Sequence, residues 1–133
     1  MALQFSTAVL NARLNSIETT VGVAAVLRLY TGSPPANCAA AATGTQLASF
    51  VLPSTWMAAA SAGVVGLSGS WSGAASTGGT AGYFRIYDPT GTTCHAQGTV
   101  GTTGTDMIVT PSATLTASQP FLVTAFNITD PNS

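Results

Sequence analysis

The spacing of apolar side chains near the start of the chain predicts an amphipathic helix over residues 6–21. Apolar positions recur there every three or four residues: Val9, Leu10, Leu14, Ile17 and Val21. The hydroxyl of Ser6 or Thr7 can cap the first turn, and Gly22 suits the left-handed position that commonly ends a helix. We therefore expect one helix at the N-terminal end.

After Gly22 the apolar period shortens to two residues, which indicates extended strands. Ala25, Leu27 and Leu29 alternate with positions of mixed polarity. Glycines and prolines separate the runs that predict strands: residues 25–30, 46–52, 64–71, 82–88, 92–98, 106–110, 113–116 and 121–129. About seven or eight strands with one N-terminal helix suit an antiparallel β-sandwich or barrel. Residues 6–133 are thus expected to form a single mainly β domain.

The clearest local signal is a hairpin over residues 82–98. Residues 88–91, Asp-Pro-Thr-Gly, suit a type I turn followed by a glycine bulge. The register expected from this turn sets Ile86 opposite Cys94 on an apolar face. The other face then carries polar and aromatic side chains: Tyr83, Arg85, Tyr87 and His95.

Charge is almost absent from the chain. It has three arginines, no lysine and four carboxylates, which give a net charge of −1, whereas about a quarter of the residues of a typical soluble domain are charged. A surface made largely of small and hydroxyl side chains is poorly protected against association. We therefore expect other copies or another protein to cover much of it. Nucleic-acid binding through phosphate neutralisation is not expected, because there is no basic patch.

Neither a membrane span nor an export signal is expected. The longest nearly apolar stretch, residues 57–67, is shorter than the roughly 20 residues that a spanning helix needs. The first residues lack a basic segment followed by an apolar run.

The groups that could carry chemistry are few. The four carboxylates have structural explanations, so we expect no catalytic residues, no cofactor and no metal site. Cys94 and His95 are neighbours in a strand, and their side chains should point to opposite faces. Cys38 and Cys94 can form one disulfide or remain two thiols, and the sequence leaves both open.

Two groups of residues are candidate assembly contacts. The first is the polar face of the hairpin, since Tyr and Arg dominate interface hot spots; it comprises Tyr83, Arg85, Tyr87 and His95. The alternative for that face is an ordinary half-exposed sheet surface. The second is an arm at residues 1–5, with Leu3 and Phe5 as anchors. Trp56 and Trp71 can either fill the core or stack against sugars.

Four stretches are distinctive: FSTAVLNARLNSIETTVG, TGSPPANCAAAATGTQLA, LPSTWMAAASAG and GYFRIYDPTGTTCHAQGTV. Together they resemble a group of small virion structural proteins of tailed bacteriophages and prophages. The resemblance covers nearly the whole chain and brings no catalytic motif. It implies a non-enzymatic head decoration (cement) protein that binds the major capsid protein and copies of itself.

Such a protein is made in the bacterial host cytoplasm and is located on the head surface of the virion, where it stabilises the capsid lattice. A tail-associated tube, terminator or adaptor component is the alternative. A glycan-binding adhesive module that uses the two tryptophans is a third hypothesis.

Overall fold

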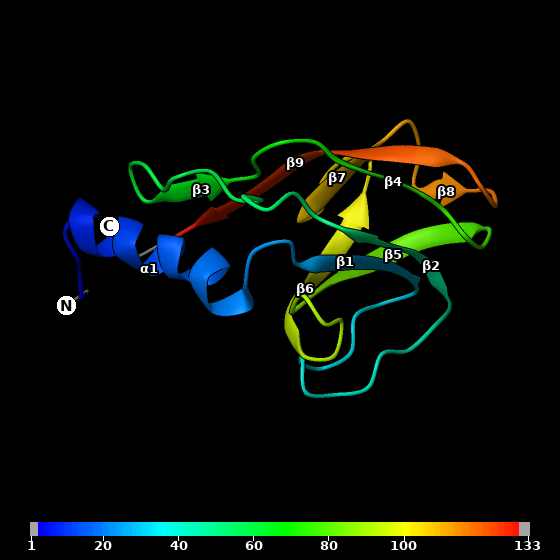
Figure 1. Ribbon diagram of the computed structural model, residues 1–133, viewed down its shortest axis with the longest axis horizontal. Coiled ribbons are helices and arrows are strands. Elements are labelled where there is room, and N and C mark those ends of the chain that lie inside the picture. Colours follow the sequence, from blue (N-terminus) through cyan, green and yellow to red (C-terminus); the bar gives the residue numbers. More distant parts are fainter. Residues whose placement is uncertain (1–2, 131–133) are drawn as a thin grey trace.

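A computed structural model describes residues 3–130 of the chain (Figure 1). Within these residues there is one helix, α1 (Thr7–Val21). The strands are β1 (Val26–Thr31), β2 (Gln46–Val51), β3 (Val64–Gly66), β4 (Trp71–Ala74), β5 (Gly79–Tyr87), β6 (Cys94–Gly101), β7 (Met107–Thr110), β8 (Thr114–Leu115) and β9 (Pro120–Thr129). The predicted class, mainly β with one N-terminal helix, is confirmed. The first two residues of the predicted arm lie outside the described residues.

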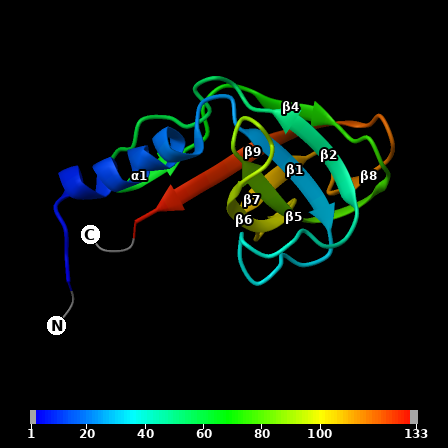
Figure 2. The same cartoon turned by 60° about the horizontal axis from the view of Figure 1, so that its bottom comes forward.

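The nine strands form one curled sheet (Figure 2). Its order is β2-β1-β5-β6-β7-β9-β3, with β4 also paired to β9 and β8 to β5. The curled sheet brings β4 close to β2. The Ser76 N–H, just after β4, donates to the carbonyl of Leu47 in β2 at 2.8 Å. Gly73 of β4 lies so close to Phe50 of β2 that a Cβ would be 2.7 Å from the ring. The sheet is therefore a partly open barrel with a single core.

One pair of neighbouring strands, β6 and β7, is parallel rather than antiparallel, and Asp106 explains why. The chain doubles back over residues 102–106. There the Asp106 carboxylate accepts hydrogen bonds from the Thr99 N–H at 2.9 Å and from its hydroxyl at 3.1 Å. A parallel pair normally needs a crossover of a dozen or more residues. Here only two residue pairs are parallel, Val100 with Met107 and Gly101 with Ile108, and the bonds between Asp106 and Thr99 fasten the short connection between the strands.

The β5–β6 hairpin forms, but the predicted register is wrong. Ile86 lies opposite Ala96, two residues from the expected partner, and a bulge follows that sets Tyr87 opposite Cys94. The turn is longer than predicted, because the Asp88 N–H donates to the Thr93 carbonyl at 3.0 Å. The bulge moves Cys94 off the apolar face and onto the face that carries Tyr87. In this position the Cys94 side chain is half-buried.

Trp56 and Trp71 fill the core of the barrel. Their rings are 5.9 Å apart, and Trp71 also lies 5.6 Å from the ring of Phe126. Each indole N–H is satisfied by backbone: Trp56 donates to the Gly22 carbonyl at 2.9 Å, and Trp71 donates to the Ser68 carbonyl at 3.0 Å. Trp56 thereby ties the end of α1 to the barrel.

Helix α1 forms as predicted and projects beyond the barrel. Ser6 caps it by accepting a hydrogen bond from the Val9 N–H at 3.3 Å, and Gly22 ends it with φ of 112°. Its buried residues are Leu10, Leu14 and Val21. Together with β3 and the end of β9, the helix forms one end of the long axis of the molecule, with β8 at the other (Figure 1).

A polar stripe of α1 holds the loop segment before β3, residues 57–63. Asn11 accepts a hydrogen bond from the Gly63 N–H at 3.0 Å, and Asn15 accepts one from the Ala60 N–H at 2.8 Å. Glu18 accepts a third, from the Met57 N–H, at 2.7 Å. The helix therefore saturates backbone donors along residues 57–63 that would otherwise face solvent.

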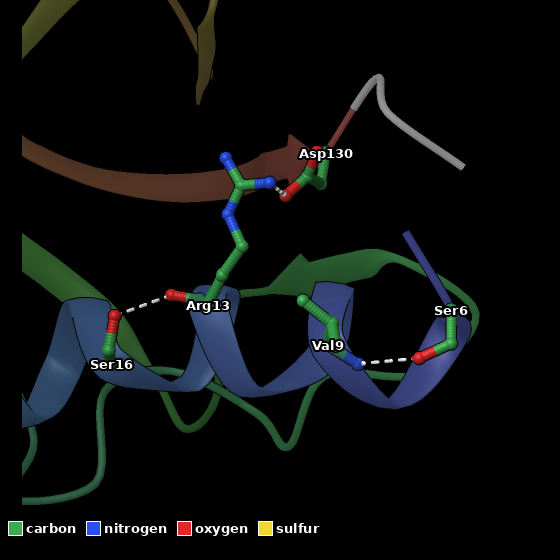
Figure 3. A network of polar contacts seen from close by, with 5 residues as sticks. All are labelled: Ser6, Val9, Arg13, Ser16 and Asp130. Atoms are coloured by element: carbon green, nitrogen blue, oxygen red, sulfur yellow. Dashed lines mark hydrogen bonds and ion pairs between the residues drawn. The ribbon is translucent and has the colours of Figure 1, made fainter. Parts of the chain in front are cut away.

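A second contact fastens α1 to the end of β9. Arg13 lies 3.2 Å from the Asp130 carboxylate, whose side chain is only 5% exposed (Figure 3). Phe5, just before the helix, packs beneath the same guanidinium, 5.1 Å from its ring centroid. The described part of the arm, residues 3–5, is thus attached to the helix through the contact between Phe5 and Arg13.

Candidate functional site

The polar face of β5 predicted as an assembly contact is covered by the protein itself. Tyr83, Arg85 and Tyr87 are 0%, 3% and 7% exposed. Residues 32–45, here called the cover loop, bind Tyr83 and Arg85, and Arg28 lies over the ring of Tyr87. These three side chains are therefore buried within the protein, and the prediction that they contact a partner finds no exposed surface there. Sequence reasoning missed this because the loop has no apolar period that would mark it as packed. His95 does lie at the surface.

Hydrogen bonds from β5 and β6 hold the cover loop in place. Arg85 donates to Gln97 at 3.1 Å and to the carbonyls of Asn37 and Ala40 at 3.2 and 2.8 Å. The Gln97 amide donates to the Pro35 carbonyl at 2.6 Å. A buried guanidinium is costly unless its donors are satisfied, and the loop carbonyls satisfy them.

Two tyrosines stack beneath the cover loop beside Arg85. The rings of Tyr30 and Tyr83 are 5.0 Å apart and nearly parallel. The Tyr30 hydroxyl lies 3.3 Å from that of Tyr87. Burial and this neighbouring hydroxyl raise the pKa of Tyr30 to about 12. The Tyr30 hydroxyl therefore keeps its proton at physiological pH.

Cys38 and Cys94 meet at the margin of the cover loop. Both are free thiols and both are half-buried. Burial and the adjacent Cys38 thiol raise the pKa of Cys94 to about 12. The structure thus brings together the two residues that the sequence offered as a disulfide, and it contains them as thiols.

Every charged side chain of the chain falls within residues 3–130, and each has a partner there. Asp88 accepts from the Thr92 N–H at 2.9 Å, which lowers the pKa of its carboxyl group. Arg28 lies over the Tyr87 ring, 4.5 Å from its centroid. The remaining members have been described above: Arg13, Glu18, Arg85, Asp106 and Asp130. Because only seven of the 133 residues are charged, an approaching partner meets a surface of mainly neutral groups.

The apolar side chains left exposed gather at particular places. The most exposed in the described region are Leu3, Val9, Val23, Val51, Val64 and Leu122. Leu3, at 67% exposure, and Val9, at 41%, lie at the free end of α1, and Val64 of β3 lies at the same end of the molecule. Val23 and Val51 lie instead where β1 starts and β2 ends. The α1 end therefore exposes Leu3 of the arm, Val9 of the helix and Val64 of β3.

The grooves of the surface do not pair acidic groups. The groove beside residues 55–59 contains Glu18, and the one beside β9 contains Asp130. Among residues 3–130 no three His, Cys, Asp or Glu side chains lie close enough to hold a metal ion. No helix in that range is long and apolar enough to cross a membrane.

Comparison with known proteins gives no match: neither a protein-family model, nor a curated protein, nor a solved structure matches this chain. The resemblance to virion structural proteins therefore remains a prediction.

Proposed function

We propose that the chain is a non-enzymatic structural protein of a tailed-phage virion, which decorates the head by binding the lattice of the major capsid protein and copies of itself. The observation that carries the proposal is the scarcity of charge, since the chain has seven charged side chains and two of them, Arg85 and Asp130, are buried. A surface left mainly neutral favours stable coverage by neighbouring proteins over a free existence in solution. The resemblance of the four sequence stretches supplies the virion context.

The contact surface proposed is the α1 end of the molecule. Leu3 and Val9 expose apolar side chains there, and Phe5 is anchored by Arg13 at the base of the arm. Exposed apolar groups that cluster at one end mark a protein contact more often than isolated ones do. This surface replaces the β5 face, since that face is already buried.

Substitution at the α1 end tests the proposal on virus particles. Leu3→Asp combined with Val9→Asp should reduce the number of copies per major capsid protein at least tenfold, measured by quantitative mass spectrometry of purified particles. An aspartate near a helix N-terminus is favourable to the helix, so folding should persist. Val51→Asp is the matched control, because Val51 is 64% exposed and lies on β2. Equal occupancy for all three proteins would contradict the proposed surface.

A tail-associated tube, terminator or adaptor ring is the alternative. Heads purified without tails discriminate between the two: abundant copies on such heads support decoration, whereas copies confined to tails support the ring. The structure does not support the two tryptophans as a glycan-binding site. Trp56 and Trp71 are 1% and 0% exposed, so neither ring has a face free to stack against a sugar.

A further inference from the structure

Arg85 and the cover loop position the two cysteines against each other. Arg85 binds the carbonyls of Asn37 and Ala40, which lie on either side of Cys38. On the other side of the contact, the β5–β6 register places Cys94 opposite Tyr87, two residues along β5 from Arg85. The Cys94 thiol donates to the Ala96 carbonyl at 3.5 Å, and the Cys38 thiol is near enough to help raise the pKa of Cys94. Two segments 56 positions apart in the sequence thus present their thiols to one another.

We propose that Cys38 and Cys94 form a redox site, in which a small-molecule disulfide such as oxidised glutathione converts the two thiols into one internal disulfide that locks the cover loop onto β6. Both side chains are half-buried rather than sealed in the core, so the oxidant has access. A disulfide needs closely spaced Cβ atoms, and the attachment of the cover loop to Arg85, beside the Tyr87–Cys94 pair, places the two segments next to each other.

The chemistry is thiol–disulfide exchange in two steps. The Cys38 thiolate attacks one sulfur of oxidised glutathione, forms a mixed disulfide and releases one glutathione thiolate. The Cys94 thiolate then attacks the Cys38 sulfur, which breaks the mixed disulfide and releases the second glutathione. The protein loses two protons and two electrons, and one oxidised glutathione becomes two glutathione thiols.

The second step should depend on pH, because the thiolate is the attacking species. Cys38 from the cover loop, Arg85 and Tyr87 from β5, and the adjacent His95 of β6 are the ionisable groups around Cys94. Burial and the Cys38 thiol raise the pKa of Cys94, while Arg85 opposes that shift. Closure should therefore accelerate as pH rises from about 7 to about 9.

The bridge would have a consequence for assembly, and this consequence alone rests on the proposed function. The thiols stay reduced in the bacterial cytoplasm, where glutathione is reduced, and close after particles reach an oxidising medium. The disulfide would then add a covalent link to the hydrogen bonds that already hold the cover loop, once the particle is released.

The test uses the purified full chain with oxidised glutathione. We expect two free thiols per chain to disappear by thiol titration, intact mass to fall by two hydrogens, and peptide mapping to link the peptides that contain Cys38 and Cys94. The oxidised protein should unfold at a temperature higher by roughly 10 °C than the reduced one. None of these readouts depends on virus particles, so the outcome is separate from that of the occupancy experiment.

Cys38→Ser and Cys94→Ser are the controls, and neither should give the two-hydrogen loss or the melting shift. In Cys94→Ser the mixed disulfide at Cys38 should accumulate, since its resolving thiol is absent. Two glutathione adducts on the original chain, covalent dimers without the internal link, or two thiols that stay free while the unfolded chain reacts would each overturn the proposal.

Discussion

Arg85 is the residue on which the position of the cover loop depends most directly. Its guanidinium is buried, and it is the donor for two loop carbonyls. Replacing it by methionine, which has similar length and no charge, removes the donors and leaves the carbonyls unsatisfied. We expect the free energy of unfolding in urea to fall by about 2 kcal/mol.

Arg28→Met is the matched control for this substitution. Arg28 is only half-buried, and its Nε donates to the exposed Ser49 hydroxyl at 3.3 Å. Limited proteolysis with elastase, which cleaves after small side chains, should cut the Ala-rich cover loop faster in Arg85→Met than in Arg28→Met. Equal cleavage rates would mean that Arg85 does not hold the loop.

Two ionisable residues should make the protein less stable in alkali. Tyr30 and Cys94 have pKa values raised to about 12, from ordinary values of 10.0 and 9.0. At a pH between the ordinary and the raised pKa, each of these residues keeps its proton in the folded chain and releases it in the unfolded chain. The free energy of unfolding therefore decreases as pH rises from about 9 to about 12. The melting temperature measured by circular dichroism from about pH 8 to about pH 11 should fall accordingly. In a protein with Tyr30→Phe and Cys94→Ser the fall should be shallower, and an identical slope would refute the assignment.

At the scale of elements, the docking of α1 depends on the amide side chains of its polar stripe. Asn11→Ala and Asn15→Ala should each destabilise the protein by about 1 kcal/mol, because each leaves a backbone N–H without its acceptor. Hydrogen exchange of the Gly63 amide should accelerate in the first variant and that of Ala60 in the second. Ser16→Ala is the control, since Ser16 bonds only to the Arg13 carbonyl of its own helix among the contacts observed. Uniform exchange in all three proteins would argue that packing alone positions the helix.

The same helix illustrates what the sequence could and could not predict. Its apolar stripe has a period of 3.6 residues, and that period predicted the limits of the helix and the burial of Leu10, Leu14 and Val21. It was wrong for Val9, which lies on the predicted stripe and is 41% exposed. Asn11, Asn15 and Glu18 recur at a similar spacing, and this signal could have identified the polar docking stripe. The strand alternation at Ala25, Leu27 and Leu29 likewise predicted core residues, all three of which are fully buried.

The features that escaped prediction depend on contacts between distant segments. The cover loop is held through backbone carbonyls, which every residue type has, so its composition of Pro, Ala and Asn contains no sign of Arg85. The hairpin register depended on which residue pairs with Asp88 across the turn: Thr92 was expected, and Thr93 is observed. The bulge then decided which face of the sheet the Cys94 side chain lies on. The parallel β6–β7 pair required the side chain of Asp106 to find Thr99, which no local pattern specifies.

At the scale of the whole molecule, the scarcity of charge predicts how association should respond to salt. Ion pairs across an interface weaken when mobile ions screen them. Since the chain has only seven charged side chains, binding to capsids should change by less than about twofold between roughly 0.05 and 0.5 M sodium chloride. Occupancy measured by sedimentation of particles over this range checks the prediction. A loss of tenfold or more would point to ion pairs between the proteins.

The elongated arrangement of Figure 1 has a practical consequence for engineering. Residues 3 and 130 both lie at the α1 end, and the turn after β8 lies at the far end of the long axis. If the α1 end faces the shell, a tag fused next to either of those residues would be trapped against it, whereas a short epitope grafted into residues 116–119 would point outward. The pole that carries β8 is therefore where foreign cargo should be displayed, and antibody access to such an epitope on intact particles would report the orientation of the protein.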